Sequence, residues 1–457
     1  MARAVEMDLT SGSIFKKLII YAIPFIFSNI LQILFSATDI AVLGMMVNDD
    51  AVAAVGANSS LNNLLVGFFI GVSMGANVVL SRYVGARDLE NSRRTVGTSI
   101  LIAFIAGFIL LVIGVPMADT FLVWMGCDAE ILPQASIYLK IYFLGMPIMM
   151  IYNFGASILR AVGDTKRPLI YLVIGGVANV ILNVLFILMG MTVEGVAIGT
   201  IVSQFISMVL ILIALFKSSG YGALRRKYLK IYKKQLNEII QIGLPSGIQS
   251  VAFNISNVLI QSKVNAFGKI GMSGNTTAQQ FDSMVYQVGH AISMSVMAFV
   301  GQNVGAKRMD RVKKTILKGT VIVVAFEFIV GALFALLSGP LCGIIASTPE
   351  VIEYAKLRLK IMCITYFLCG IMENLAYSMR AMGKSVTAMI VSILGACVFR
   401  TLFVEILFNV YPYFSTLFIS YPASWLVTIL MYVFLLPRTY KNLKHKMEKG
   451  KDKAVIE

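Results

Sequence analysis

Long apolar runs, separated by short polar loops, occupy most of the chain. Twelve of these runs reach the roughly 17–25 residues that an α-helix needs to cross a bilayer. They cover residues 15–43, 51–80, 95–117, 133–159, 168–189, 193–216, 237–267, 276–303, 318–338, 354–380, 386–409 and 413–436. None shows the roughly 10-residue dyad alternation of an outer-membrane barrel. The pattern predicts an all-α polytopic membrane protein with twelve transmembrane helices.

The composition agrees with a membrane protein, because 58% of the 457 residues are hydrophobic and only 14% are charged. The mean hydropathy of +0.82 is far above that of ordinary soluble domains. The two histidines, and the five cysteines without a CxxC pair, indicate neither a zinc site nor a disulfide framework. We therefore expect no cofactor in this chain, which we take to be a monomer in the lipid bilayer.

The net charge of +16 comes from basic residues in short loops and not from a soluble domain, so no nucleic-acid partner is expected. Most of the 39 Lys and Arg residues fall in loops and tails on one side of the predicted bundle. Loops on the other side, such as "GMMVNDD" and "LMGMTVEG", have almost none. The positive-inside rule makes the basic side cytoplasmic. We expect a multi-pass protein of the cell membrane with both termini in the cytoplasm.

The chain contains an internal repeat at an almost constant offset. "RYVGARDLENSRRTV" after the second run resembles "QNVGAKRMDRVKKTI" after the eighth, and their Val-Gly-Ala triplets lie 220 residues apart. Arg160 in "LRAVGD" and Arg380 in "MRAMGK" are also 220 residues apart. Six helices per repeat, an even number, give both halves the same orientation. We expect two six-helix lobes related by a pseudo-two-fold axis along the membrane normal, as in alternating-access transporters.

The predicted organisation has four parts. They are an N-terminal six-helix lobe (1–216), a basic cytoplasmic linker (217–236), a C-terminal six-helix lobe (237–436) and a basic cytoplasmic tail (437–457). Pro24 and Pro245 occupy corresponding positions in the first helix of each lobe. Such prolines can bend a helix where a moving lobe needs bending, and static kinks are the alternative.

Five stretches carry a resemblance to a known family. They are "MDLTSGSIFKKLIIYAIP" near the start, "DIAVLG" at the end of the first helix, the two "VGA" loops, and "LRAVGDTKRPLIYLVIGGVANVILNVLFI" across the fourth and fifth helices. Over essentially its whole length the chain resembles the multidrug and toxic compound extrusion (MATE) family. The resemblance implies a transporter and not an enzyme. It implies export of amphipathic, mostly cationic drugs and dyes, coupled to a proton or sodium gradient by alternating access.

The same resemblance implies a cation-coupling site formed by Asp39, Asn179, Asn183 and Thr200. Asn183 departs from the aspartate of some family members, which removes one proton carrier. At 1.5 Å per residue, Asn183 lies about 23 Å from the cytoplasmic start of its helix, so it falls in the outer half of the lobe with Asp39 and Thr200. The cluster could hold a proton or sodium, and no other metal is expected. The alternative is an interfacial Asp39, with Asn and Thr side chains bonding between helices.

The second lobe differs chemically from the first. Aligning "SATDIAVLG" with "IQSKVNAFG" sets Lys263 against Asp39. Charges in lipid are usually paired or face a cavity. The spans of this lobe contain Lys263, Asp282, Glu327, Glu373, Arg400 and Glu405, and all but Glu327 form a possible charge network or substrate site. A Lys263–Asp282 ion pair is one possibility. Arg400 and Glu405 are five apart on one helix, so each should have its partner on another helix.

Other functions fit the sequence less well. A flippase for lipid-linked oligosaccharide or a related amphipathic lipid shares the two-lobe plan and is the alternative. Extra helices and a cavity rich in Arg and Lys would be expected for it. A membrane enzyme is disfavoured because neither His290 nor His445 belongs to an HExxH motif, and no paired metal ligands appear. A nucleotide-driven pump is disfavoured because the chain has no GxxxxGK[ST] loop. Small amphipathic molecules are therefore the expected partners.

Overall fold

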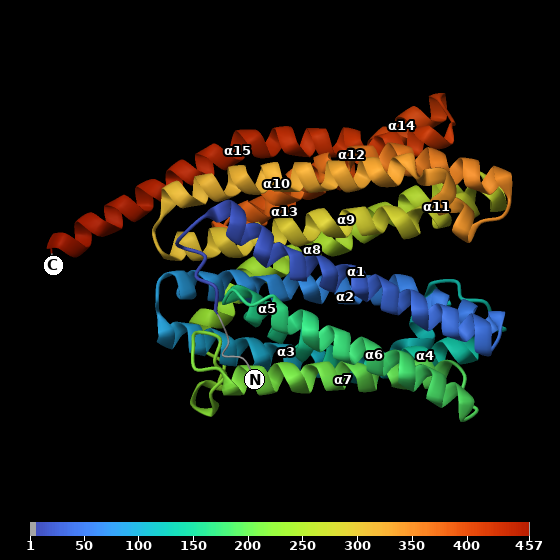
Figure 1. The fold of residues 1–457 in the computed structure, drawn as a ribbon, viewed down its shortest axis with the longest axis horizontal. Coiled ribbons are helices and arrows are strands. Elements are labelled where there is room, and N and C mark those ends of the chain that lie inside the picture. Colours follow the sequence, from blue (N-terminus) through green and yellow to red (C-terminus); the bar gives the residue numbers. More distant parts are fainter. Residues whose placement is uncertain (1–5, 457) are drawn as a thin grey trace. The chain divides into compact units, whose positions relative to one another are not determined.

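The computed structural model describes residues 6–456, and most of these residues are helical (Figure 1). Residues 1–5 and 457, which belong to the predicted N-terminal lobe and tail, lie outside the described residues, as do the side chains at 49, 60 and 450–456. The helices are α1 (Ile14–Met46), α2 (Asp49–Gly85), α3 (Leu89–Trp124), α4 (Leu132–Leu144), α5 (Met146–Ala161), α6 (Lys166–Leu188), α7 (Val193–Lys217), η1 (Arg226–Tyr228), α8 (Lys233–Asn265), α9 (Gly268–Gly305), α10 (Met309–Leu336), α11 (Ser338–Ile345), α12 (Pro349–Ala381), α13 (Ser385–Ser392), η2 (Ile393–Phe399), α14 (Arg400–Val410) and α15 (Phe414–Ile456).

Each predicted span coincides with one helix or with two or three joined helices. Within the described residues, ten helices are long and apolar enough to cross a membrane, and α4 with α5 forms an eleventh span that is bent by 50°. The bend lies at Gly145, and Pro147 follows in the first turn of α5. The remaining predicted span is α8, whose 33 residues include polar ones such as Gln249 and Asn254. The all-helical polytopic fold is confirmed.

The described chain divides into two compact units. Unit 1 consists mainly of Phe27–Gly243, and unit 2 of Leu9–Ile26 with the chain from Leu244 onward. The chain therefore passes from one unit to the other inside α1 and again inside α8. Pro24 and Pro245 lie within two residues of these two points. Whether they bend the helices during transport stays a prediction.

In unit 1, α2 and the first part of α8 approach each other at two glycines. A Cβ atom on Gly75 would lie 2.3 Å from the backbone oxygen of Ile239, and a Cβ atom on Gly243 would lie 2.5 Å from the backbone oxygen of Val72. Backbone atoms cannot move aside as a flexible side chain can. Small residues let transmembrane helices come this close, so glycine is required at both positions.

The segment predicted as a linker, residues 217–236, is part of unit 1. Its backbone packs on α3, where Thr98 Oγ1 donates a hydrogen bond to the Lys230 carbonyl oxygen at 3.2 Å. The Tyr228 carbonyl lies so close to Gly97 that a Cβ atom there would be 1.9 Å from its oxygen. These contacts hold the segment against one unit along most of its length.

The internal repeat extends to backbone conformation. Arg87 follows α2 with a φ of 58°, and Lys307 follows α9 with a φ of 56°. The loops after α5 and α12 likewise have Gly163 at 94° and Gly383 at 85°. Both pairs are 220 residues apart, and left-handed backbone is rare for residues other than glycine. The two halves therefore end corresponding helices with the same turn.

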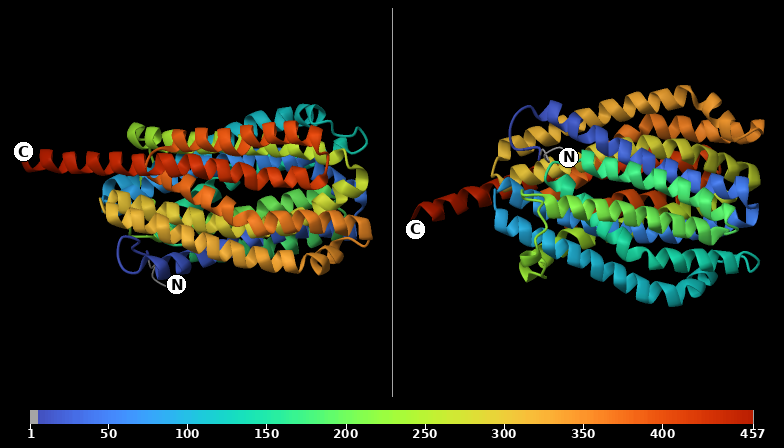
Figure 2. Two further views of the ribbon diagram at one scale, coloured as in Figure 1. Left: turned by 90° about the horizontal axis from the view of Figure 1, so that it is seen from above. Right: turned by 60° about the horizontal axis from the view of Figure 1, so that its bottom comes forward.

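Unit 2 is built around α12, which packs against α9, α10 and α15. Figure 1 shows these long helices running alongside one another, and in Figures 1 and 2 α15 continues past its neighbours toward the C-terminus. A Cβ atom on Gly331 of α10 would lie 2.0 Å from the Cys363 carbonyl oxygen of α12, so these two helices are also in close backbone contact. The first part of α1 joins this unit, where Tyr21 packs edge-on against Phe299 at 5.7 Å.

Candidate functional site

Asp39 lies in the second half of α1, next to α6 and α7 of the same unit. Asn183 Nδ2 donates a hydrogen bond to Asp39 Oδ1 at 2.6 Å, and Asn179 Nδ2 donates one to Thr200 Oγ1 at 3.3 Å. The side chains of Thr200 and Asn179 also approach the Asp39 carboxylate. Asn183 is completely buried and Asn179 almost so. The structure therefore brings together all four residues of the expected coupling site, whose role in coupling stays a prediction.

Two amide oxygens of this cluster have no hydrogen-bond partner among the described residues. They are Oδ1 of Asn179 and Oδ1 of Asn183, and both are buried. Asn183 Oδ1 lies against Gly199, where a Cβ atom would be only 2.3 Å away. Burying a polar atom without a partner is unfavourable, so these oxygens are available to accept from a donor or to bind a cation.

The arrangement can bind a small cation in two ways. The Asp39 carboxylate can take up a proton, or it can join the amide and hydroxyl oxygens around it as a set of hard oxygen ligands. A transition-metal site has less support, because no group of three or more His, Cys, Asp or Glu side chains is placed to hold a metal within the described chain.

Two ion pairs of unit 2 differ from the pair considered from sequence. Lys263 Nζ lies 2.9 Å from Glu405 Oε2, and an Arg358 terminal nitrogen lies 2.8 Å from Asp282 Oδ2. The predicted ion pair between Lys263 and Asp282 is therefore wrong, because α12 places Arg358 against Asp282. Glu405 has its partner on another helix, as expected. Arg358 was missed, although it lies inside the span predicted at 354–380 and the rule that intramembrane charges need partners could have singled it out.

Arg400 has partners on α15 but no acidic one among residues 6–456. Its Nε donates a hydrogen bond to Ser424 Oγ at 3.1 Å. Its guanidinium carbon lies 4.1 Å from the centre of the Tyr421 ring. The side chain is only 4% exposed. The expectation of a partner on another helix is thus met by a hydroxyl group and an aromatic ring, and not by a carboxylate.

Glu373 belongs to a buried polar cluster between α9, α10 and α12. Tyr286 donates a hydrogen bond to Glu373 Oε1 at 2.9 Å, and His290 Nδ1 lies 3.3 Å from Glu373 Oε2. Glu327 is also close to Glu373, is 1% exposed, and leaves its Oε2 without a partner. It packs against Gly370, where a Cβ atom would lie 1.9 Å from that oxygen. The place of Glu327 beside Glu373 could not be read from the sequence.

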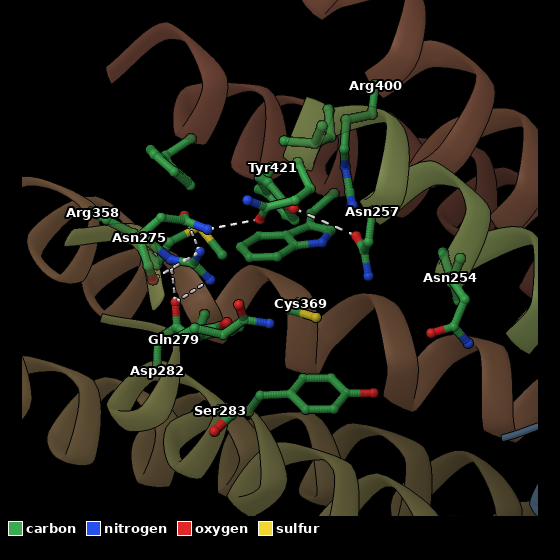
Figure 3. A pocket seen from close by; sticks show the side chains of 18 of the residues that line it. Asn254, Asn257, Asn275, Gln279, Asp282, Ser283, Arg358, Cys369, Arg400 and Tyr421 are labelled. Carbon is green, nitrogen blue, oxygen red and sulfur yellow. Dashed lines mark hydrogen bonds and ion pairs between the residues drawn. The ribbon is translucent and has the colours of Figure 1, made fainter. Parts of the chain in front are cut away.

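A cavity of about 370 Å³ lies inside unit 2, lined by residues of α8, α9, α12, α14 and α15 (Figure 3). Asp282, Glu373 and Arg400 form part of its wall, whereas Lys263 and Glu405 do not. Three of the five residues in the possible second-lobe site therefore meet in one cavity. The volume falls in the range of small-molecule sites, which are concave, mostly apolar and furnished with a few polar groups.

The chain is similar to bacterial proteins over most of its length. It is 26% identical over 444 residues to the probable multidrug resistance protein YoeA of Bacillus subtilis, a match that covers 93% of this chain and 94% of that protein. It is also 26% identical over 389 residues to the probable multidrug resistance protein NorM of Thermotoga maritima, covering 83% and 82%.

The chain shares its fold with a solved transporter, and a family model matches its sequence. A solved outward-facing multidrug resistance MATE family transporter of the MOP superfamily has a TM-score of 0.90 with this structure, 20% sequence identity, and coverage of 97% of this chain and 100% of that one. The MatE family model matches the chain twice, at residues 24–185 and 245–406. The two matches confirm the internal repeat and together include well over half of the chain, which therefore belongs to the MatE family.

Proposed function

We propose that the chain is a secondary active efflux transporter of the cell membrane, with both termini in the cytoplasm, that exports amphipathic, mostly cationic organic compounds by alternating access. Membership of the MatE family supports a transporter. The multidrug names of the relatives in Bacillus subtilis and Thermotoga maritima support drugs and dyes as substrates. The basic loops on one side support the orientation.

The observation that carries the proposal is the Asp39 cluster. A carboxylate within an apolar helix is costly, reaching about 2.5–3.5 kcal/mol on insertion scales at the helix centre, so the presence of Asp39 calls for a function. Around it lie an amide that donates a 2.6 Å hydrogen bond and two buried amide oxygens without partners. A coupling cation, either a proton or sodium, would satisfy these groups. Its arrival would change how α1 packs on α6 and α7, and α1 continues into unit 2.

Vesicles with imposed gradients test this proposal. The reconstituted protein should export the cationic dye rhodamine 123 when a proton or a sodium gradient is applied, and the gradient that works identifies the ion. Asp39→Asn keeps the shape of the side chain but removes its charge, so gradient-driven export should fall to the level of empty vesicles.

Asp119→Asn is the matched control for this variant. Asp119 lies near the end of α3, has a side chain that is 56% exposed, and pairs with Lys140 at 2.8 Å. The control should transport like wild type. Normal export by a folded Asp39→Asn variant would exclude Asp39 as the coupling site, and no export by wild type under either gradient would overturn the proposed function.

A further inference from the structure

The cavity of unit 2 contains one cation that the protein does not neutralise. Arg358 is paired with Asp282 in the wall, and Lys263 is paired with Glu405 outside it. Arg400 forms no ion pair anywhere in the part of the chain that the structure describes. Its guanidinium has five N–H donors, and one of them, on Nε, is used by Ser424.

Arg400 is buried, and it lies well inside its predicted span. Ten residues separate it from Val410 at the end of α14, which corresponds to about 15 Å along the helix axis. An arginine side chain is too short to reach the membrane surface from that depth. A buried charge without a counter-ion is strongly unfavourable, so a group that supplies the missing negative charge would bind here with a large gain.

A π-helix directs the side chain into the cavity. The seven residues of η2, Ile393–Phe399, end immediately before Arg400. π-Helical turns are rare and are often found at functional sites. Gly395 within this turn brings the backbone against α15, since a Cβ atom there would lie 2.2 Å from Thr428 Oγ1. Figure 3 shows Arg400 extending from its helix toward Tyr421 and Asn257.

Aromatic rings form the wall next to the guanidinium. Tyr421 lies under Arg400 and contacts Trp425, with ring centres 6.0 Å apart. Trp425 in turn contacts Tyr366 at 5.5 Å. A flat aromatic ligand can stack on such a surface while its polar group reaches the guanidinium.

Neither acidic group of the wall neutralises Arg400, because Asp282 is paired with Arg358 and Glu373 has other partners. Glu373 accepts a hydrogen bond from Tyr286, lies beside His290, and forms no ion pair with Arg400. Cys369 is close to both charged groups, so they share one region of the cavity. A zwitterionic ligand would therefore meet a group of each sign.

We propose that this cavity binds aromatic substrates that carry a carboxylate, and that Arg400 holds the carboxylate through paired hydrogen bonds. A planar guanidinium matches a carboxylate in this way better than any other side chain does. The proposal rests on the proposed function and adds to it a substrate class, since a carboxylate supplies the negative charge that Arg400 lacks.

Rhodamine 110 and rhodamine 123 form a matched pair of probes. They have the same aromatic system, but rhodamine 110 has a free carboxylate where rhodamine 123 has a methyl ester. Fluorescence polarisation with the purified full-length protein in detergent gives the affinity for each dye. Wild type should bind rhodamine 110 at least about tenfold more tightly than rhodamine 123, which is the range of a charge-assisted hydrogen-bonded pair.

Three variants locate the source of the preference. Arg400→Gln should lose the preference for rhodamine 110 while it keeps its affinity for rhodamine 123, which also shows that the protein is folded. Arg400→Lys keeps the charge and should retain part of the preference. Lys269→Gln removes an equivalent positive charge from an exposed position of α9 that does not line the cavity, and should behave like wild type.

Two results would overturn the inference. One is equal or weaker binding of rhodamine 110 by wild type, which needs no variant and no transport. The other is an unchanged preference in folded Arg400→Gln or in Arg400→Lys. The proposed function is tested separately, since absence of gradient-driven rhodamine 123 export would refute the efflux proposal whatever the binding results are.

Discussion

Replacing Asp282 with asparagine would leave Arg358 in unit 2 without its carboxylate partner. The side chains of Asp282 and Arg358 are 2% and 10% exposed, and Arg358 Nε and a terminal nitrogen each lie 2.8 Å from the same carboxylate oxygen. Arg358 also donates to Asn275 and lies 5.1 Å from the centre of the Phe418 ring. These other contacts would hold the guanidinium in place, so its charge would stay buried.

The size of the effect follows from the geometry. Two unit charges 2.8 Å apart attract each other by about 6 kcal/mol at an effective dielectric constant of about 20. Asparagine keeps an oxygen that can accept a hydrogen bond, and breaking a buried pair in this way typically costs about 3–5 kcal/mol. The double variant Asp282→Asn/Arg358→Met also removes the stranded charge. We expect it to recover at least half of the lost stability.

Unfolding in mixed micelles of mild detergent and SDS, followed by tryptophan fluorescence, measures these differences. Trp425 lies in the cavity wall and reports on unit 2 directly. Glu353→Gln is the control, because Glu353 pairs with Lys356 at 2.6 Å on the exposed surface of the same helix, and it should leave the midpoint unchanged. The reasoning is refuted if Asp282→Asn has the same unfolding midpoint as this control. It is also refuted if the double variant loses as much stability as the single variants Asp282→Asn and Arg358→Met lose together.

Three further results are expected. Gly370→Ala should destabilise unit 2 by about 1–3 kcal/mol, since its Cβ atom would lie 1.9 Å from Glu327 Oε2. Gly243→Ala should destabilise unit 1 by a similar amount, because its Cβ atom would meet the backbone oxygen of Val72 at 2.5 Å. Burial and a neighbouring carboxylate raise the pKa of the Cys127 thiol, so labelling of this loop residue by an impermeant maleimide should increase with pH above the ordinary thiol range.

One control serves the two glycine variants and another serves the labelling assay. Gly56→Ala places a methyl group on α2 with nothing within 4 Å and should be neutral in the same unfolding assay. A neutral Gly243→Ala would show that α2 and α8 are not packed as described. Cys127→Ser gives the background of the labelling assay. Labelling of Cys127 only after the cells are permeabilised would place this loop in the cytoplasm and reverse the proposed orientation.

The positions of the helices could be predicted because of the physics of the bilayer. A segment in lipid must satisfy its own backbone hydrogen bonds, so a long apolar run leaves little choice but a helix. The predicted run 133–159 nevertheless contains a bend that a hydropathy pattern does not show. Gly145 and Pro147 were the available signals, since both interrupt regular helical packing and hydrogen bonding.

The contacts within the candidate sites were harder to predict than the helices. Asn179 and Asn183 share a helix face because they are four residues apart, and that spacing is fixed by helix geometry. Whether Lys263 meets Asp282 or Glu405 depends on how each helix is rotated about its axis, which the sequence spacing does not determine. The π-helix before Arg400 shifts the register of every later side chain on that span. No residue type in Ile393–Phe399 marks this change in advance.

The passage of the chain between the units inside α1 and α8 makes each unit dependent on the other half of the sequence. Unit 2 incorporates Leu9–Ile26, and unit 1 incorporates the first turns of α8, up to Gly243. A break in the loop near Gly220 would thus give two fragments that exchange helical segments reciprocally, like the protomers of a domain-swapped dimer. Neither fragment contains a complete unit. Co-expressed halves should reassemble into a working protein, whereas either half made alone should be degraded.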